Sequence, residues 1–129
     1  MRSTLSVWIV VGILTALPAK AAIIAYDPAA GTVGNQNFGG ALGIDFNVIS
    51  GIEITELGVF DSASDGLANS LTATLYNRAT QTALATLTFT PGDPGTLTNG
   101  SRFKRSARPL NYCQDSRARL SLTGTVLPK

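Results

Sequence analysis

The chain has 129 residues, of which 44% are hydrophobic and only 14% are charged, whereas about 25% charged is typical of soluble globular chains. Thr, Ser and Gly replace the missing charge, a usage typical of pleated, turn-rich β structure rather than of helices. The sequence contains no histidine, which excludes Ser-His-Asp and Cys-His nucleophilic sites and His-containing zinc sites. The single cysteine, Cys113, excludes an internal disulfide and a cysteine metal cluster.

Residues 1–21 have the pattern of a secretory signal peptide, which we expect to form a helix that precedes the domain. Arg2 precedes the apolar run LSVWIVVGILTAL, and Ala19 and Ala21 form an A-x-A cleavage pattern. The alternative is an uncleaved membrane anchor, but the run is shorter than the ~20 residues that a spanning helix needs. We therefore predict export with cleavage before Ala22. The protein would be secreted or extracellular and would meet a membrane only transiently, through the signal peptide.

The charge is divided unevenly along the rest of the chain. Residues 22–100 hold one basic residue against seven acidic ones, whereas residues 101–129 hold seven basic residues and one acidic residue, Asp115. We therefore divide the chain into a signal peptide (1–21), a β-sandwich domain (22–104) and a basic, atypical tail (105–129). Two interpretations of the tail stay open: a naturally divergent ending, or a truncation or altered reading frame after Lys104. The second predicts that residues 105–117 are loosely attached.

Strand patterns follow one another along the domain. Residues 23–26 (IIAY) predict a short apolar strand, and residues 28–40 predict a loop rich in Gly and Asn. In residues 41–49, Leu, Ile, Phe and Val alternate with small or polar residues, which predicts a strand with one face in a core. Residues 51–60 alternate less regularly, and a β-bulge near Glu56 would explain the slip.

The clearest local feature is a predicted β-hairpin, made of residues 71–77 and 82–89 around a short polar connection. The partners of Leu71, Ala73 and Leu75 stay open between two sets, which are Leu84, Thr86 and Thr88, or Ala83, Ala85, Leu87 and Phe89. Residues 91–95 (PGDPG) predict a turn, and residues 119–126 (RLSLTGTV) predict a possible closing strand beside an edge strand. The fold class expected from these strands is all-β, a single β-sandwich or jelly-roll-like domain.

An ordered series of short motifs runs from residue 43 to residue 89: an I-x-I-T-x-L-G-x-F-D strand, a D-G-L loop, and an L-Y-N strand that leads into L-A. The matching residues are Ile52, Ile54, Thr55, Leu57, Gly58, Phe60, Asp61, Asp65, Gly66, Leu67, Leu75, Tyr76, Asn77, Leu84, Ala85 and Phe89. In this series the chain resembles an uncharacterised β-sandwich domain of exported bacterial proteins, many of them PEP-CTERM proteins sorted to the cell surface. The resemblance implies no established activity. The C-terminus departs from it, because it lacks the Pro-Glu-Pro motif, the apolar run and the basic cluster of such proteins.

The loop at residues 61–70 is the candidate metal site. Asp61, Asp65 and Asn69 are four residues apart, and Gly66 allows a tight turn between them. Oxygen ligands of this kind suit calcium. The alternative is a purely structural loop, because Asx residues beside Gly between strands commonly bond their own backbone. We expect no other cofactor.

Further side chains suggest ligand contacts of other kinds. Tyr76 is a candidate for stacking on a sugar ring, although on an alternating strand it is also a residue that packs half-buried. Glu53 and Glu56, or Asp61 and Asp65, are candidate carboxylate pairs for glycoside hydrolysis, with solvated surface as the default. The basic tail lacks interleaved aromatic residues, so we expect no nucleic-acid partner.

These observations favour an exported, non-enzymatic module, a structural or adhesion protein of the cell surface or the extracellular matrix. The partners expected are extracellular polysaccharide or other surface proteins. Two alternatives stay open: a carbohydrate-binding module that uses the D-G-L loop and Tyr76, and a fragment of a glycan-acting enzyme.

Overall fold

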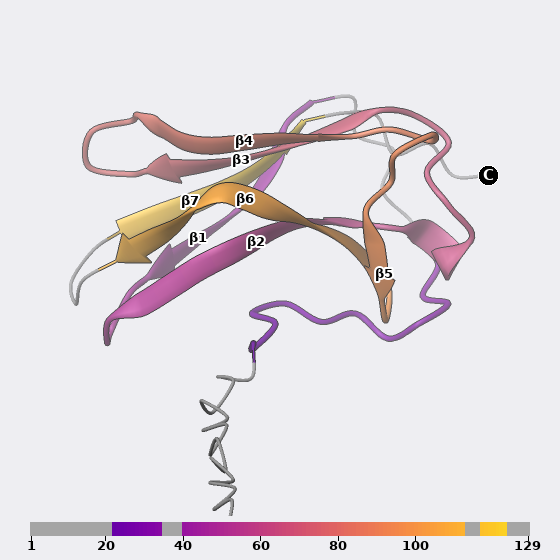
Figure 1. Ribbon diagram of the computed structural model, residues 1–129, viewed down its shortest axis with the longest axis horizontal. Coiled ribbons are helices and arrows are strands. Elements are labelled where there is room, and N and C mark those ends of the chain that lie inside the picture. Colours follow the sequence, from indigo (N-terminus) through magenta and orange to yellow (C-terminus); the bar gives the residue numbers. More distant parts are fainter. Residues whose placement is uncertain (1–21, 35–39, 113–116, 124–129) are drawn as a thin grey trace, which may run out of the picture.

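The computed structural model describes residues 22–34, 40–112 and 117–123, so the signal-peptide prediction lies outside the described residues. These form an all-β sandwich of seven strands, which confirms the predicted fold class (Figure 1). The strands are β1 (Leu42–Asn47), β2 (Ile52–Phe60), β3 (Leu71–Asn77), β4 (Ala83–Phe89), β5 (Thr96–Thr98), β6 (Ser101–Tyr112) and β7 (Arg117–Thr123). A four-stranded sheet has the order β1-β7-β3-β4, and a three-stranded sheet has the order β2-β6-β5.

The predicted hairpin is present as β3 and β4. Leu71 pairs with Phe89, Ala73 with Leu87 and Leu75 with Ala85, which decides for the second of the two partner sets. Asn77 fixes the connection, because its Oδ1 accepts hydrogen bonds from the backbone of Ala79 (2.8 Å) and Thr80 (3.2 Å). Such a side-chain bond to the backbone two or three residues ahead is typical of Asn in turns.

The predicted irregularity near Glu56 is also confirmed, although the extra residues lie on the partner strand. Ile54 pairs with Leu110 and Glu56 with Arg105, so three more residues separate the pairs in β6 than in β2. The inserted stretch contains Pro109, which has no backbone N–H to give to a ladder and is therefore suited to a bulge.

The sandwich extends well beyond Lys104. Strand β6 continues through this residue to Tyr112, which is only 7% exposed, and pairs with β2 both before and after the bulge. Of residues 105–117, for which loose attachment was expected, Arg105 and residues 110–112 are therefore paired with β2. Strand β7 lies between β1 and β3, so its neighbours are one edge strand and one inner strand. Residues 113–116 and 124–126 lie outside the described residues.

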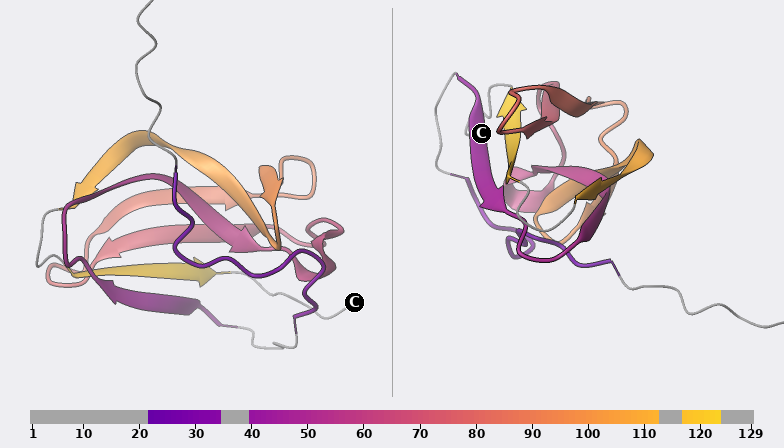
Figure 2. Two further views of the ribbon diagram at one scale, coloured as in Figure 1. Left: turned by 90° about the horizontal axis from the view of Figure 1, so that it is seen from below. Right: turned by 90° about the vertical axis from the view of Figure 1, so that its left-hand side faces the viewer.

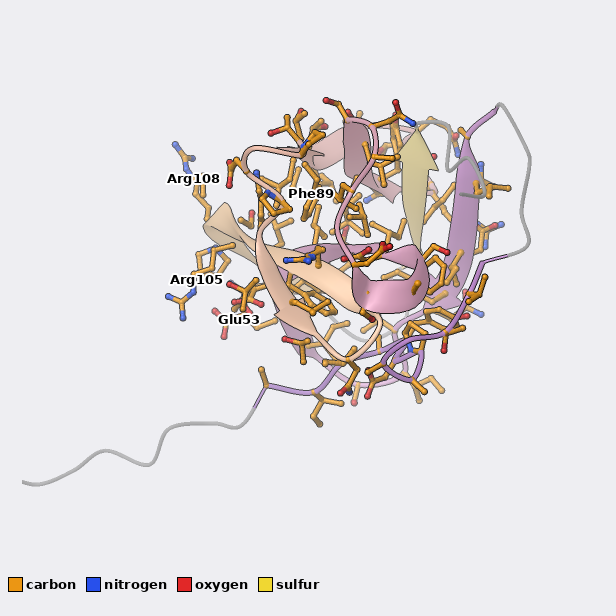
Figure 3. The ribbon with its side chains drawn as sticks, turned by 90° about the vertical axis from the view of Figure 1, so that its right-hand side faces the viewer. Glu53, Phe89, Arg105 and Arg108 are labelled. Atoms are coloured by element: carbon orange, nitrogen blue, oxygen red, sulfur yellow. The ribbon has the colours of Figure 1, made fainter. Side chains whose placement is uncertain are left out.

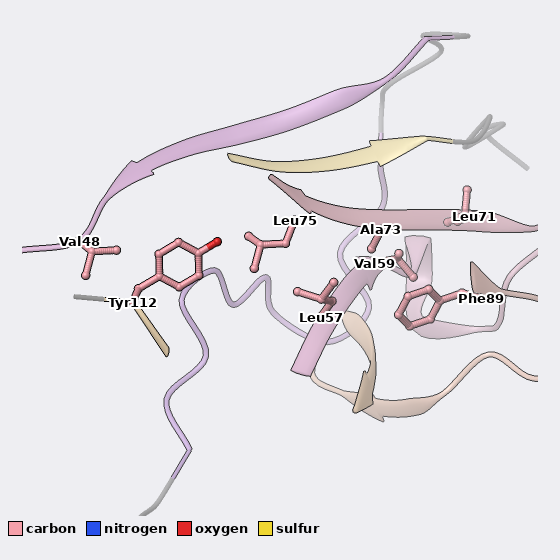
Figure 4. Packing of buried hydrophobic residues seen from close by; sticks show 8 residues of the cluster. All are labelled: Val48, Leu57, Val59, Leu71, Ala73, Leu75, Phe89 and Tyr112. Atoms are coloured by element: carbon pink, nitrogen blue, oxygen red, sulfur yellow. The ribbon is translucent and has the colours of Figure 1, made fainter. Parts of the chain in front are cut away.

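The core lies between the sheets, where β3 faces β2 and β4 faces β6. Figure 4 shows its side chains, with Phe89, Leu71 and Ala73 at one end and Tyr112 and Val48 at the other. The largest apolar side chains that are fully buried are Phe89, Leu75 and Val59, each at most 1% exposed. The alternation of the hairpin produces this arrangement, because every second residue of β3 faces the opposing sheet.

Two expectations about the N-terminal half need correction. Residues 23–26 are not a strand, and Ile23 and Tyr26 are 93% and 66% exposed. In β1, Phe46 packs against the core and Val48 follows as a buried residue, but Leu42 and Ile44 are 39% and 48% exposed. The reason is the position of β1 at the margin of the sandwich, on the side away from β6 (Figure 2, left).

Candidate functional site

The D-G-L loop is organised by the carboxylate of Asp61, which is fully buried at the end of β2. Its Oδ2 accepts a hydrogen bond from Arg102 Nε at 2.7 Å, and both carboxylate oxygens lie within 3.2 Å of the backbone nitrogen of Gly66. Gly66 adopts a positive φ of 113°, which glycine tolerates far better than other residues. The turn therefore depends on one carboxylate and one glycine.

The other two residues of the calcium hypothesis, Asp65 and Asn69, lie on the exposed part of the same loop. Among the residues that the structure describes, no three His, Cys, Asp or Glu side chains gather closely enough to hold a metal ion. Asp61 already has a cationic partner and a backbone donor, as a turn-forming aspartate does. Asp61 thus has a structural role in the turn, and the calcium hypothesis for this loop is left to experiment.

A second segment is built onto the same end of the sandwich. Gly100 N donates to Pro28 O (2.9 Å), and Asn99 Nδ2 lies 2.9 Å from both carboxylate oxygens of Asp27. Further along the segment, Gly34 N donates to Ser62 Oγ at 3.0 Å. Residues 27–34 are therefore held against the loop after β2 and the β5–β6 turn, although they form no strand.

Tyr76 lies half-buried on the outer face of the four-stranded sheet, with Arg119 of β7 beside it. Arg119 donates from Nε and Nη2 to the two carboxylate oxygens of Asp45, at 2.5 and 3.1 Å. These hydrogen bonds lower the pKa of Asp45, and the positive charges of Arg119 and Arg78 lower it further. Desolvation acts in the opposite direction but is the smaller effect. This face therefore carries an ion pair, and Tyr76 contributes an aromatic ring to it.

A groove of about 390 Å³ lies on the other side of the molecule, along the outer face of β6. Its floor is the ring of Phe103, which lies across Gly58 so closely that a Cβ there would be 2.6 Å from a ring carbon. Two ion pairs border it, Glu56–Arg105 (3.5 Å) and Asp93–Lys104 (2.6 Å). We call it the outer groove, and its lining residues are Glu56, Asp93, Gly95, Thr96, Thr98, Phe103, Lys104 and Arg105.

The carboxylates of the two candidate pairs differ in their surroundings. Glu53 and Glu56 are both exposed on β2, and Glu56 is ion-paired with Arg105. Asp61 is buried, whereas Asp65 is exposed. In Figure 3, Glu53, Arg105 and Arg108 point outward from one side of the sandwich, and Phe89 lies between the sheets.

Sequence reasoning missed the outer groove because its aromatic floor joins residues from β2 and β6. Phe103 and Gly58 are directly paired across these strands. An aromatic residue opposite a glycine is a recognisable cross-strand combination, but only when the register is known.

Comparison with protein families, with curated proteins and with solved structures finds no match to this chain. In the part of the chain that the structure describes, no helix has the length and apolar character needed to cross a membrane. Function must therefore be argued from the sequence pattern and from the two outer faces of the sandwich.

Proposed function

We propose that the protein is an exported, non-enzymatic β-sandwich module that acts as a structural or adhesion domain at the cell surface or in the extracellular matrix. The signal-peptide pattern of residues 1–21 and the resemblance of residues 43–89 to a domain of exported PEP-CTERM proteins support export.

The observation that carries the non-enzymatic role is the pairing of carboxylates with cations. Asp45, Glu56, Asp61 and Asp93 each have an arginine or lysine partner within 3.5 Å. A glycoside hydrolase needs two carboxyl groups that face each other across a substrate, about 5 to 9.5 Å apart. Carboxylates that are each neutralised by a cation are instead typical of a stable, charge-balanced scaffold.

Cell fractionation tests this proposal. We expect the protein in the medium or on the surface of the exporting cell, with an N-terminus at Ala22 by mass spectrometry. The purified protein should bind extracellular polysaccharide or surface proteins of that cell and release no reducing ends from the polysaccharide. A soluble cytoplasmic product that retains Met1 would contradict export, and polysaccharide cleavage would contradict the non-enzymatic role.

A second candidate function, carbohydrate binding, is favoured by the outer groove. Phe103 offers an aromatic ring, and the threonine hydroxyls and the two ion pairs around it offer donors and acceptors. Small-molecule sites have volumes from about 300 Å³ upward and contain placed polar groups that fix the orientation of the ligand. Two acidic and two basic side chains balance in charge, which favours a neutral saccharide over an anionic one.

A glycan array that contains neutral and uronic-acid oligosaccharides distinguishes the candidate sites. If the outer groove binds, Arg105→Ala should lose signal while Arg108→Ala, a matched change on the same strand outside the groove, keeps it. If the site is instead Tyr76, then Tyr76→Ala should lose signal and Arg105→Ala should keep it. Absence of binding to every glycan would remove the carbohydrate-binding candidate.

A further inference from the structure

Among the described strands, the smaller sheet has one fewer than the larger sheet. The two sheets have four and three strands, and β2 forms one edge of the smaller sheet. In the described residues, eight of the nine residues of β2 pair with β6 on one side, and β2 pairs with no strand on the other. A free edge of this length carries unpaired N–H and C=O groups that can template another strand.

Apolar residues of the opposing sheet, beyond the strand that faces β2, are incompletely covered. Leu42 and Ile44 lie on the inner face of the four-stranded sheet. They are in register with Ala73 and Leu75 of β3, because β7 pairs with both strands. Ala73 and Leu75 are at most 1% exposed, whereas Leu42 and Ile44 are 39% and 48% exposed. Ile52, on the inner face of β2 beside the buried Tyr112, is 40% exposed. The inner face therefore continues beyond the strands that cover it.

The same chain carries an apolar segment without a strand partner. Residues 23–26 (IIAY) have a strand-type sequence, yet Ile23 is 93% and Tyr26 66% exposed. The hydrogen bonds of Asp27 to Asn99 and of Gly100 to Pro28 hold the segment at the Phe60 end of β2. Even if fully extended, residues 22–26 would span about 17 Å from that anchor, whereas β2 is about 27 Å long. The segment therefore cannot reach Ile52 of its own chain.

We propose that residues 23–26 of one chain add as a strand to the free edge of β2 in a second copy and cover Leu42 and Ile44 there. Backbone hydrogen bonds to the β2 edge supply affinity, and alternate side chains of the added strand face the uncovered apolar residues. Donor and acceptor are different surfaces of the same chain, so the contact is head-to-tail and builds open chains or rings. This assembly goes beyond the adhesion role and does not depend on it.

Two single variants separate the donor from the acceptor. Ile23→Asp places a charge in the donor segment at a residue that is almost fully exposed, so folding is not affected. Ile44→Lys places a charge on the acceptor face at a half-exposed residue, and an inward-pointing charge prevents strand addition there. Val33→Asp is the matched control, because Val33 is 74% exposed and lies outside residues 23–26.

The test measures the mass of the exported protein by light scattering after gel filtration, at rising protein concentration. We expect the original chain and Val33→Asp to form species of two and more chains, and each of the two interface variants to remain a single chain. An equimolar mixture of Ile23→Asp and Ile44→Lys should form species of two chains and no larger ones, because it retains one intact donor and one intact acceptor. A variant that failed to fold would not show this recovery.

Three results would overturn the proposal: a single-chain mass for the original protein at every concentration, loss of assembly in Val33→Asp, or a mixture of the two variants that stays monomeric. A monomer that still binds polysaccharide would leave the adhesion proposal standing. An assembly that binds nothing at the cell surface would support the assembly and contradict the adhesion proposal.

Discussion

Arg102 lies on the inner face of β6 and contacts the fully buried carboxylate of Asp61 at 2.7 Å. The pair joins the loop after β2 to the start of β6, and the backbone of Gly66 adds a further donor to the same carboxylate. A buried charge that loses its partner is costly, because it keeps its desolvation penalty without compensation.

Arg102→Met should therefore lower the free energy of unfolding by about 3 kcal/mol, since it leaves Asp61 charged and unpaired. Urea unfolding followed by circular dichroism measures this change. Combining it with Asp61→Asn should recover much of the loss, because the amide oxygen still accepts from Gly66 and no isolated charge remains. Fully additive losses in the double variant would contradict this account.

The same geometry gives an expectation for calcium at Asp61, Asp65 and Asn69. A bound ion would have to compete with Arg102 for the Asp61 carboxylate, so we expect Ca²⁺ and EDTA to leave the melting temperature unchanged. A true site would gain about 2.7 kcal/mol at a hundredfold excess of calcium over its Kd. A rise in melting temperature that Asp65→Ala abolishes would establish the loop as a calcium site.

Removing the hydroxyl of Tyr112 should stabilise the protein, in contrast to Arg102→Met. This group is buried at the end of the core and has no hydrogen-bond partner in the described structure. Because an unsatisfied buried hydroxyl is destabilising, Tyr112→Phe should raise the free energy of unfolding by about 1 kcal/mol. Urea titration checks the gain, and a clear loss of stability would show that the hydroxyl has a partner.

The pH dependence of the same variant is a second measurement. Burial raises the pKa of Tyr112 above its ordinary value of about 10. The unfolded chain therefore releases this proton first, and the contribution of Tyr112 to stability is lost as the pH rises from about 10 through the raised pKa. The extra stability of Tyr112→Phe should consequently grow above pH 10 and stay constant at neutral pH.

The parts of the fold that the sequence predicted depend on neighbours along the chain. The β3–β4 hairpin was predictable because alternation and turn residues lie within 19 residues, from Leu71 to Phe89. Strand β6 was missed because Arg102 and Lys104 occupy inward positions, where a strand pattern is expected to have apolar side chains. Their partners, Asp61 and the Thr88 carbonyl, lie on other segments, so the sequence alone gives no sign that these charges are satisfied.

The candidate sites show the same division. The D-G-L loop and Tyr76 could be located from local motifs, and the loop lies where the motif predicted a turn. The segment 23–26 has the composition of a strand but forms none in the described structure, because composition alone does not stabilise a strand that has no partner. The outer groove depends on Gly58 lying opposite Phe103, which only the register reveals.

A glycine pair tests how closely the turn before β5 approaches β6. Gly95 has a positive φ of 78°, and a Cβ there would lie 2.5 Å from the carbonyl oxygen of Phe103. Gly95→Ala should therefore lower the free energy of unfolding by about 2 kcal/mol, through strain and overlap together. Gly92→Ala is the matched control, since nothing lies within 4 Å of its added methyl group, and it should change stability by less than about 0.5 kcal/mol. Equal effects on chemical unfolding would contradict the close approach.

The last prediction concerns the basic tail, whose origin the sequence left open. Strand β7 pairs with β1 and β3. Leu120 of this strand lies opposite Leu75 of β3 and packs against the core. If β7 belongs to the domain, Leu120→Ala removes packed methyl groups and should lower the free energy of unfolding by about 2 kcal/mol. Ser121→Ala, on the opposite face of the same strand, should change it by less than about 0.5 kcal/mol. Equal stability of both variants and the original chain would show that β7 does not pack as a native strand.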